Sequence, residues 1–198
     1  MAQAEGFSAI SASAGPSLSP LLGELIEAKR LARRPDIARL VPARVRGGGV
    51  IWGFARVEAD ERYYMPSPDG RTVALIAPAY ERRGNCTYIV DLVATSISTR
   101  AVRRRRGEAA ILGDDWIDCA IEARRPVRLY ENPLWWVNGR CHGAVVLDWR
   151  DLAYRLAEAS SIICQTTTLA ERVSDAFARP IPMPPLYVPP AQETRHAA

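Results

Sequence analysis

The spacing of apolar residues changes twice along the chain, and these changes limit the folds that it can adopt. Between residues 18 and 34 apolar residues recur at helical spacing. From residue 50 to 94 they stand in runs typical of strands, separated by turn residues. Beyond residue 113, apolar runs alternate with segments at helical spacing, as in β-α-β units. We therefore predict an α+β to α/β fold, with an N-terminal helix and small antiparallel sheet before C-terminal βαβ-type units with a parallel portion.

Local signals place several elements of this fold. Ser19-Pro20 is typical of a helix start, since serine caps and proline suits the first turn. Strand-like segments at 63–65 and 71–77 flank a Pro- and Gly-containing turn, which predicts a hairpin between them. The nearly continuous apolar run 86–94 predicts a central strand.

The last helix has its own predicted start and buried face. Thr168 and Glu171 form the pattern of a capping box. Leu169, Val173 and Phe177 follow at four-residue steps and are expected to face the core.

The chain has 198 residues, of which 48% are hydrophobic, so it can build a core without disulfides or a structural metal. We expect a single globular domain over 18–179, divided into a helix and antiparallel part (18–99) and a βαβ-type part (100–179). Residues 1–17 are small and polar and predict a disordered tail. Residues 180–198 predict a proline-rich tail.

The cysteines and the apolar runs indicate the cellular compartment in which the protein is expected. None of the four cysteines forms a C-x-x-C pair, and Cys119 and Cys164 stand in apolar stretches, so we expect buried free thiols. No apolar run approaches the roughly 18 residues of a membrane span. The N-terminus lacks the basic segment of a secretory signal. We therefore predict a cytoplasmic protein with no membrane partner.

Positive charge is concentrated in two places. All but one of the 26 basic residues are arginines, and the net charge is +4. The first cluster is Lys29, Arg30, Arg33, Arg34, Arg39, Arg44 and Arg46; the second is Arg100, Arg103, Arg104, Arg105 and Arg106.

Because four consecutive arginines cannot all point inward, the second cluster predicts a positive surface segment. Guanidinium groups bind phosphate through two hydrogen bonds, so nucleic acid or an acidic protein is the predicted partner. Two alternatives remain open: a solvated charge run, and a coding bias toward G and C that replaces lysine by arginine. The net charge is also far below that of a dedicated nucleic-acid binder.

Three carboxylates follow predicted strands. Glu131 ends the strand predicted at 127–130, while Asp148 and Asp151 lie at the end of the next one. Ligands of open α/β sheets bind outside the carboxyl ends of strands, so the three side chains are candidate Mg²⁺ ligands for phosphodiester chemistry. Their order is similar to that of Toprim domains, although the Asp-x-Asp pair of that family is absent. The alternative is that Asp151 caps a helix and Asp148 binds an arginine.

For two further groups of polar residues, the sequence favours a structural role over a catalytic one. Asp114, Asp115 and Asp118 lie at the start of a predicted helix, where they complement the helix dipole. His142 stands beside Cys141 in a predicted loop, and adjacent side chains diverge too much to form a nucleophile pair.

The chain has no G-x-G-x-x-G, G-K-[ST] or G-x-S-x-G motif. We therefore expect a non-enzymatic accessory or binding protein, without a cofactor, that contacts nucleic acid or an acidic partner through its arginine clusters. The alternative is a divalent-metal-dependent enzyme acting on phosphodiesters through Glu131, Asp148 and Asp151, with Mg²⁺ as its cofactor.

Overall fold

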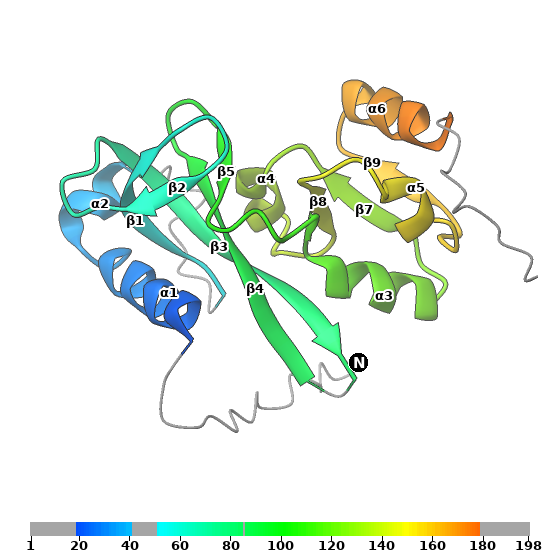
Figure 1. Cartoon of the computed structure of the whole chain (residues 1–198). Helices are drawn as coiled ribbons and strands as arrows, with labels where there is room; N and C mark the ends of the chain where they lie inside the picture. Colours follow the sequence, from blue (N-terminus) through cyan, green and yellow to red (C-terminus); the bar gives the residue numbers. More distant parts are fainter. Residues whose placement is uncertain (1–18, 41–50, 85, 179–198) are drawn as a thin grey trace, which may run out of the picture.

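The computed structural model describes residues 19–40, 51–84 and 86–178 (Figure 1). The tails predicted at 1–17 and 180–198 lie outside these residues. The helices are α1 (Pro20–Leu31), α2 (Pro35–Leu40), α3 (Asp114–Glu122), α4 (Pro133–Asn138), α5 (Leu152–Arg155) and α6 (Thr167–Ala178). The strands are β1 (Gly53–Ala59), β2 (Tyr64–Pro66), β3 (Thr72–Arg83), β4 (Cys86–Ser96), β5 (Val102–Arg104), β6 (Ile111–Leu112), β7 (Val127–Tyr130), β8 (Ala144–Val146) and β9 (Ile162–Cys164).

The first sheet, sheet A, is antiparallel and curled. Its strand order is β2-β1-β3-β4-β5. The two outer strands approach each other at a single parallel bridge between Tyr63 and Arg104. The N-terminal helix and the antiparallel sheet predicted from the sequence are thus confirmed.

The predicted hairpin between 63–65 and 71–77 is wrong, because β2 pairs with β1. Asp60 closes the β1–β2 turn: its Oδ1 accepts hydrogen bonds from the backbone N–H groups of Arg62 and Tyr63 at 2.7 and 2.6 Å. The chain then crosses β1 so closely that a Cβ on Gly70 would lie 2.7 Å from the backbone of Val57. Glycine permits this crossing, which brings β3 to the other side of β1.

The second sheet, sheet B, has the order β6-β8-β7-β9. Strand β7 is parallel to both β8 and β9, while β6 pairs with β8 in the antiparallel sense. Helices lie between the parallel strands along the chain, as in βαβ units. The parallel portion predicted for the C-terminal half is confirmed, and the whole fold is α+β.

Three apolar clusters hold these layers together. Helix α1 packs Leu21 and Leu25 against one face of sheet A. The other face of sheet A meets sheet B and α4 through a cluster that includes Leu75 and Trp136. Helices α3, α5 and α6 contribute to a third cluster on the far face of sheet B, around Ile117. Sheet B is therefore covered on both faces, as parallel strands require.

A buried carboxylate organises the connection between the sheets. Asp91 in β4 has no exposed surface. Its Oδ1 accepts from the N–H groups of Leu92, Arg105 and Arg106 at 2.8, 3.1 and 2.9 Å. Its Oδ2 accepts from those of Gly107, Glu108 and Ala109 at 2.9, 2.9 and 3.3 Å.

Six backbone donors thus surround one carboxylate, and five of them come from consecutive residues. Such a nest of N–H groups stabilises an anion without a cationic side chain. Gly107 has a φ of +83°, a conformation that glycine adopts without strain and that helps the segment to wrap the carboxylate. The segment 105–109 leads from β5 to β6, so Asp91 fixes how sheet B leaves sheet A.

We predict that Asp91→Asn strongly destabilises the protein. The amide offers one acceptor oxygen in place of two, and each buried donor left unpaired costs about 1–3 kcal/mol. We therefore expect a loss of about 3 kcal/mol or more in the free energy of unfolding, measured by urea denaturation. The exposed Asp175→Asn is the control, with an expected change below about 0.5 kcal/mol. Equal effects of the two changes would contradict the role of Asp91.

The predicted start and face of the last helix are both shifted. The N–H of Leu169 donates to Thr166 Oγ1 at 3.2 Å, so Thr166 caps α6, and the capping box predicted at Thr168 is wrong. Leu169, Val173 and Ala176 are buried, whereas Phe177 is 44% exposed. Successive residues of a helix are 100° apart, so the seven residues from Leu169 to Ala176 complete almost two turns and bring Ala176 back to the buried face. Phe177 lies 100° further round, toward solvent.

We predict that Thr166→Ala lowers the free energy of unfolding by about 1 kcal/mol, while Thr168→Ala leaves it nearly unchanged. Phe177→Ala should cost well below the roughly 3–5 kcal/mol of a fully buried ring, because nearly half of its surface is already exposed. Chemical denaturation of the three variants measures these differences. A larger loss for Thr168→Ala than for Thr166→Ala would contradict the observed cap.

Candidate functional site

The second arginine cluster is largely used inside the protein. Arg103 donates from Nε to the carbonyl of Asp60 at 2.6 Å and from Nη1 to that of Val102 at 2.9 Å. Arg104 donates from Nη1 to the carbonyl of Ala109 at 2.9 Å.

Arg105 binds Glu24 of α1 in an ion pair of 3.0 Å, and the other carboxylate oxygen of Glu24 accepts from Tyr64 at 2.7 Å. Burial is the main cause that raises the pKa of Tyr64, with Glu24 contributing. The tyrosine therefore stays neutral and can donate this hydrogen bond. Arg105 thus ties the end of β5 to α1 and β2.

The prediction of a positive surface segment at 103–106 is corrected accordingly. Arg103, Arg104 and Arg105 are half-buried and bonded within the chain, and only Arg106 of the four is exposed, as is Arg100 in the preceding turn. The reason is that the backbone carbonyls of Asp60, Val102 and Ala109 and the carboxylate of Glu24 accept hydrogen bonds from these side chains. Most of its guanidinium groups are thus already bonded.

The first cluster keeps more of its charge at the surface. Arg30, Arg33, Arg34 and Arg39 are exposed near the α1–α2 corner, while Lys29 is half-buried. Arg30 pairs with Glu27 one turn earlier at 2.9 Å, and this exposed pair adds little stability. Arg44 and Arg46 lie outside the described residues.

The three candidate metal ligands do not form one site. Glu131 accepts from the Thr166 hydroxyl at 2.6 Å, near the start of α6. Asp148 and Asp151 line a separate cleft, and Asp151 stands at the start of α5 without a side-chain capping bond. Within the described part of the chain, no three His, Cys, Asp or Glu side chains are grouped to hold a metal ion.

Asp148 is instead bound by an arginine, as the structural alternative predicted. Arg150 Nη2 lies 2.6 Å from Asp148 Oδ2, and Arg150 Nε and backbone N–H also donate to this carboxylate. These hydrogen bonds lower the pKa of Asp148 to about 2. Asp148 is thus an ionised, occupied group.

The cleft beside Asp148 has a volume of about 470 Å³ and lies between the β3–β4 pair, segment 107–111 and segment 148–155. Its arginines are all bonded within the protein. The most connected is Arg155, whose Nε and Nη2 reach Asp114 and Asp118 on α3 at 2.8 and 2.6 Å. The predicted acidic group at the start of α3 therefore anchors α5. Five carboxylates and three arginines line the cleft: Glu81, Glu108, Asp114, Asp148, Asp151, Arg104, Arg150 and Arg155.

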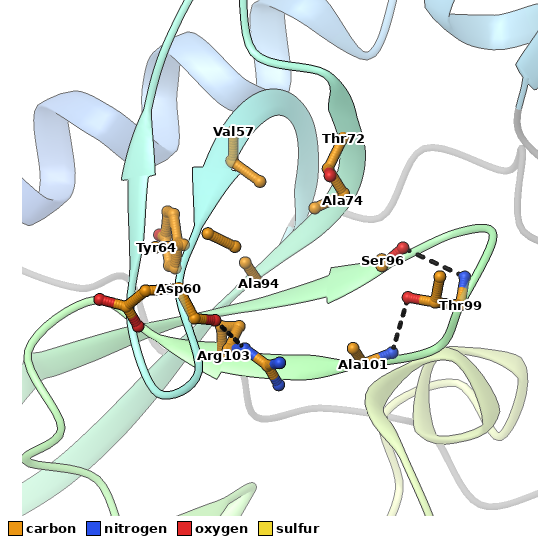
Figure 2. Close-up of a pocket in the computed structure, with 11 residues that line it drawn as sticks. Val57, Asp60, Tyr64, Thr72, Ala74, Ala94, Ser96, Thr99, Ala101 and Arg103 are labelled. Atoms are coloured by element: carbon orange, nitrogen blue, oxygen red, sulfur yellow. Dashed lines mark hydrogen bonds between the residues drawn. The ribbon is translucent and has the colours of Figure 1, made fainter.

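A second hollow lies inside the curl of sheet A, on the face that α1 partly covers (Figure 2). Its volume is about 170 Å³, and small side chains such as Ala74 and Ala94 line it. Arg103 of the second cluster stands at its rim with Asp60, as Figure 2 shows. No pattern in the sequence predicts this hollow, because its alanines come from separate strands.

The cysteines differ from expectation. Cys119 is exposed and Cys164 is half-buried, so the predicted burial of Cys119 is wrong. Cys119 is two residues from the buried Ile117, and a two-residue step turns a helix by about 200°, toward the opposite face. Burial raises the pKa of the Cys141 thiol to about 11, so that thiol is not a ready nucleophile.

Comparisons with protein-family models, with curated proteins and with solved structures found no match to this chain. In the residues that the structure describes, no helix is both long and apolar enough to cross a membrane.

We predict that Arg150→Ala raises the pKa of Asp148 from about 2 toward its ordinary value of 3.8. A lowered folded-state pKa adds stability above pH of about 4, and this stability is lost as the pH falls toward about 2. The variant should therefore lose less stability than the parent over that pH range. NMR titration of the side-chain carboxyl group measures the pKa directly. An Asp148 that still titrates near pH 2 in the variant would contradict the assigned cause.

Proposed function

We propose that this protein is a non-enzymatic binding protein that contacts the phosphate backbone of a nucleic acid through the basic residues of the α1–α2 corner. The observation that carries the proposal is the exposure of Arg33 and Arg39 at this corner. Exposed guanidinium groups neutralise backbone phosphates and release the counterions bound to the nucleic acid. This release drives sequence-independent binding.

The side-chain contacts of the two clusters favour the same corner. Within this cluster, Arg30 pairs with Glu27 in an exposed ion pair. The second cluster has fewer guanidinium groups available to bind phosphate, because Arg103, Arg104 and Arg105 bond to groups of the chain itself. Of that cluster, Arg100 and Arg106 remain as exposed secondary contacts.

Fluorescence anisotropy with labelled duplex DNA and single-stranded RNA tests the proposal. We expect binding tighter than about 100 μM at low salt that weakens steeply as salt is added. The double variant Arg33→Ser, Arg39→Ser should bind more weakly, with a log–log salt slope flatter by about two units.

The control replaces Arg125 and Arg128 by serine. Both are exposed; Arg125 follows α3 and Arg128 lies on β7, and both of these elements are across the molecule from α1 and α2 (Figure 1). The charge change is the same, so an equal loss of affinity would mean that only net charge matters. Absence of binding at about 100 μM would remove the proposal and favour an acidic protein as the partner.

The metal-dependent enzyme remains the alternative prediction. Asp148 and Asp151 do share one cleft. Against it stand the Arg150 contact on Asp148 and the Thr166 contact on Glu131, both of which would have to open before a metal could bind.

A further inference from the structure

Strand β9 is an outer strand of sheet B, and its backbone groups alternate in direction. The carbonyl of Ser161 accepts from an N–H of β7 at 2.9 Å, and the N–H of Gln165 donates to a carbonyl of β7 at 3.1 Å. Every second residue of a strand bonds to the same neighbour, so Ile163, between these two, also faces β7. The N–H and carbonyl groups of Ile162 and Cys164 therefore point outward, to the side where no described strand lies.

This edge lacks the features that usually oppose the addition of another strand. Proteins protect outer strands with charged side chains, prolines or β-bulges. Residues 159–170, which contain β9, include no charged residue and no proline, and β9 pairs with β7 in a continuous register. Ile163 is also 44% exposed. The outer strands of sheet A differ, because they approach each other at Tyr63 and Arg104.

Helix α6, which packs on β9, has an uncharged flank on the same open side. Successive helical residues are 100° apart, so Arg172 and Phe177 lie on opposite sides of the buried face of α6. The guanidinium carbon of Arg172 lies 4.1 Å from the ring centre of Trp149, in the segment after β8. Because β8 is an inner strand and β9 an outer one, the Phe177 flank faces the open edge. Ala170 and Ser174 share this flank and are exposed.

The open edge is complementary to a second copy of itself. In an antiparallel pairing of two β9 strands about a two-fold axis at Ile163, Ile162 faces the partner's Cys164. These outward residues exchange backbone hydrogen bonds, and the two Ile163 residues form the non-hydrogen-bonded pair between them. Ser161 then faces the partner's Gln165. Apolar side chains meet apolar ones and polar side chains meet polar ones, and no like charges oppose each other.

We propose that this side of the molecule binds a second copy of the chain, with β9 pairing to β9 so that two copies of sheet B form one continuous sheet. The axis is perpendicular to the sheet, so both α6 helices lie on the same face and their uncharged flanks meet. The interface is isologous, since each copy contributes the same surface. It accounts for two exposed apolar side chains, Ile163 and Phe177, each 44% exposed.

The proposed interface is independent of the nucleic-acid proposal. Strand β9 and α6 lie at the end of the molecule opposite α1 and α2 (Figure 1). Dimerisation therefore leaves the α1–α2 corner of each copy accessible, and either proposal can fail without the other.

Sedimentation velocity of the full-length protein from about 10 to 300 μM tests the proposal. We expect a reversible monomer–dimer equilibrium with a Kd of about 100 μM or tighter. Its salt dependence should be weak, because the paired surfaces carry no charge. A protein that stays monomeric at about 300 μM would overturn the proposal and leave the edge to a strand of another protein.

Two substitutions locate the interface. Ile163→Lys places like charges opposite each other at the axis, and Phe177→Asp does so between the α6 flanks, so each should weaken dimerisation at least about tenfold. The matched control is Tyr88→Lys, which replaces a side chain of similar exposure (51%) on β4 and should have little effect. Far-UV circular dichroism reports whether each variant is folded. Equal weakening by Tyr88→Lys would contradict the proposed location.

A cross-link tests the register. The Cα atoms of a non-hydrogen-bonded antiparallel pair are about 4.5 Å apart, within the range of about 4.4–6.8 Å that a disulfide spans. The double variant Ile163→Cys, Cys164→Ser should therefore form a covalent dimer when treated with oxidised glutathione. The single variant Cys164→Ser, which keeps the exposed Cys86 and Cys119, sets the background. Cross-linking no greater than this background would overturn the pairing at Ile163.

Discussion

The carboxylate of Asp91 is the interaction on which the arrangement of the two sheets depends. It lies in the middle of β4 and is bonded to five consecutive N–H groups of the segment that enters sheet B. Burying a charge is costly unless it is fully bonded, and here both oxygens are satisfied by backbone donors. The β-bulge beside Ala79 lies next to Asp91 in the ladder, where such an irregularity alters the direction of a side chain. The position of the segment 105–109 thus follows from one side chain.

The same segment explains why dense positive charge in a sequence need not be a binding surface. The backbone N–H groups of Arg105 and Arg106 serve Asp91, while the side chains of Arg103, Arg104 and Arg105 bond to carbonyls and to Glu24. Arginine suits this work because its planar fork bonds several acceptors at once. The run therefore stabilises the junction of β2, β5 and α1, and the less dense cluster near α2 is the more exposed one.

What could be predicted from the sequence is what depends on local pattern. The helix after Pro20, the long strand that begins at Cys86 and the strand Val127–Tyr130 carry clear apolar spacing, and all three are present. The pairing of strands was harder to predict from the sequence. The pairing of β2 with β1, for example, depends on the Asp60 turn and on the close crossing at Gly70. The surroundings of Arg103 involve a carbonyl 43 residues earlier in the chain, which no spacing rule reveals. Equally, the hollow exists only once alanines from separate strands are brought together.

The curl of sheet A has a consequence for how copies of the chain behave at high concentration. An outer strand with unpaired backbone groups is a template on which another chain can add a strand, and this is a common route to aggregation. In sheet A the outer strands β2 and β5 approach each other at Tyr63 and Arg104, and the N–H of Arg104 donates to the carbonyl of Arg62 at 3.2 Å. Each outer strand thus shields part of the other's edge. A chain with this many strand-forming residues gains protection against self-association from the same curvature that creates the hollow.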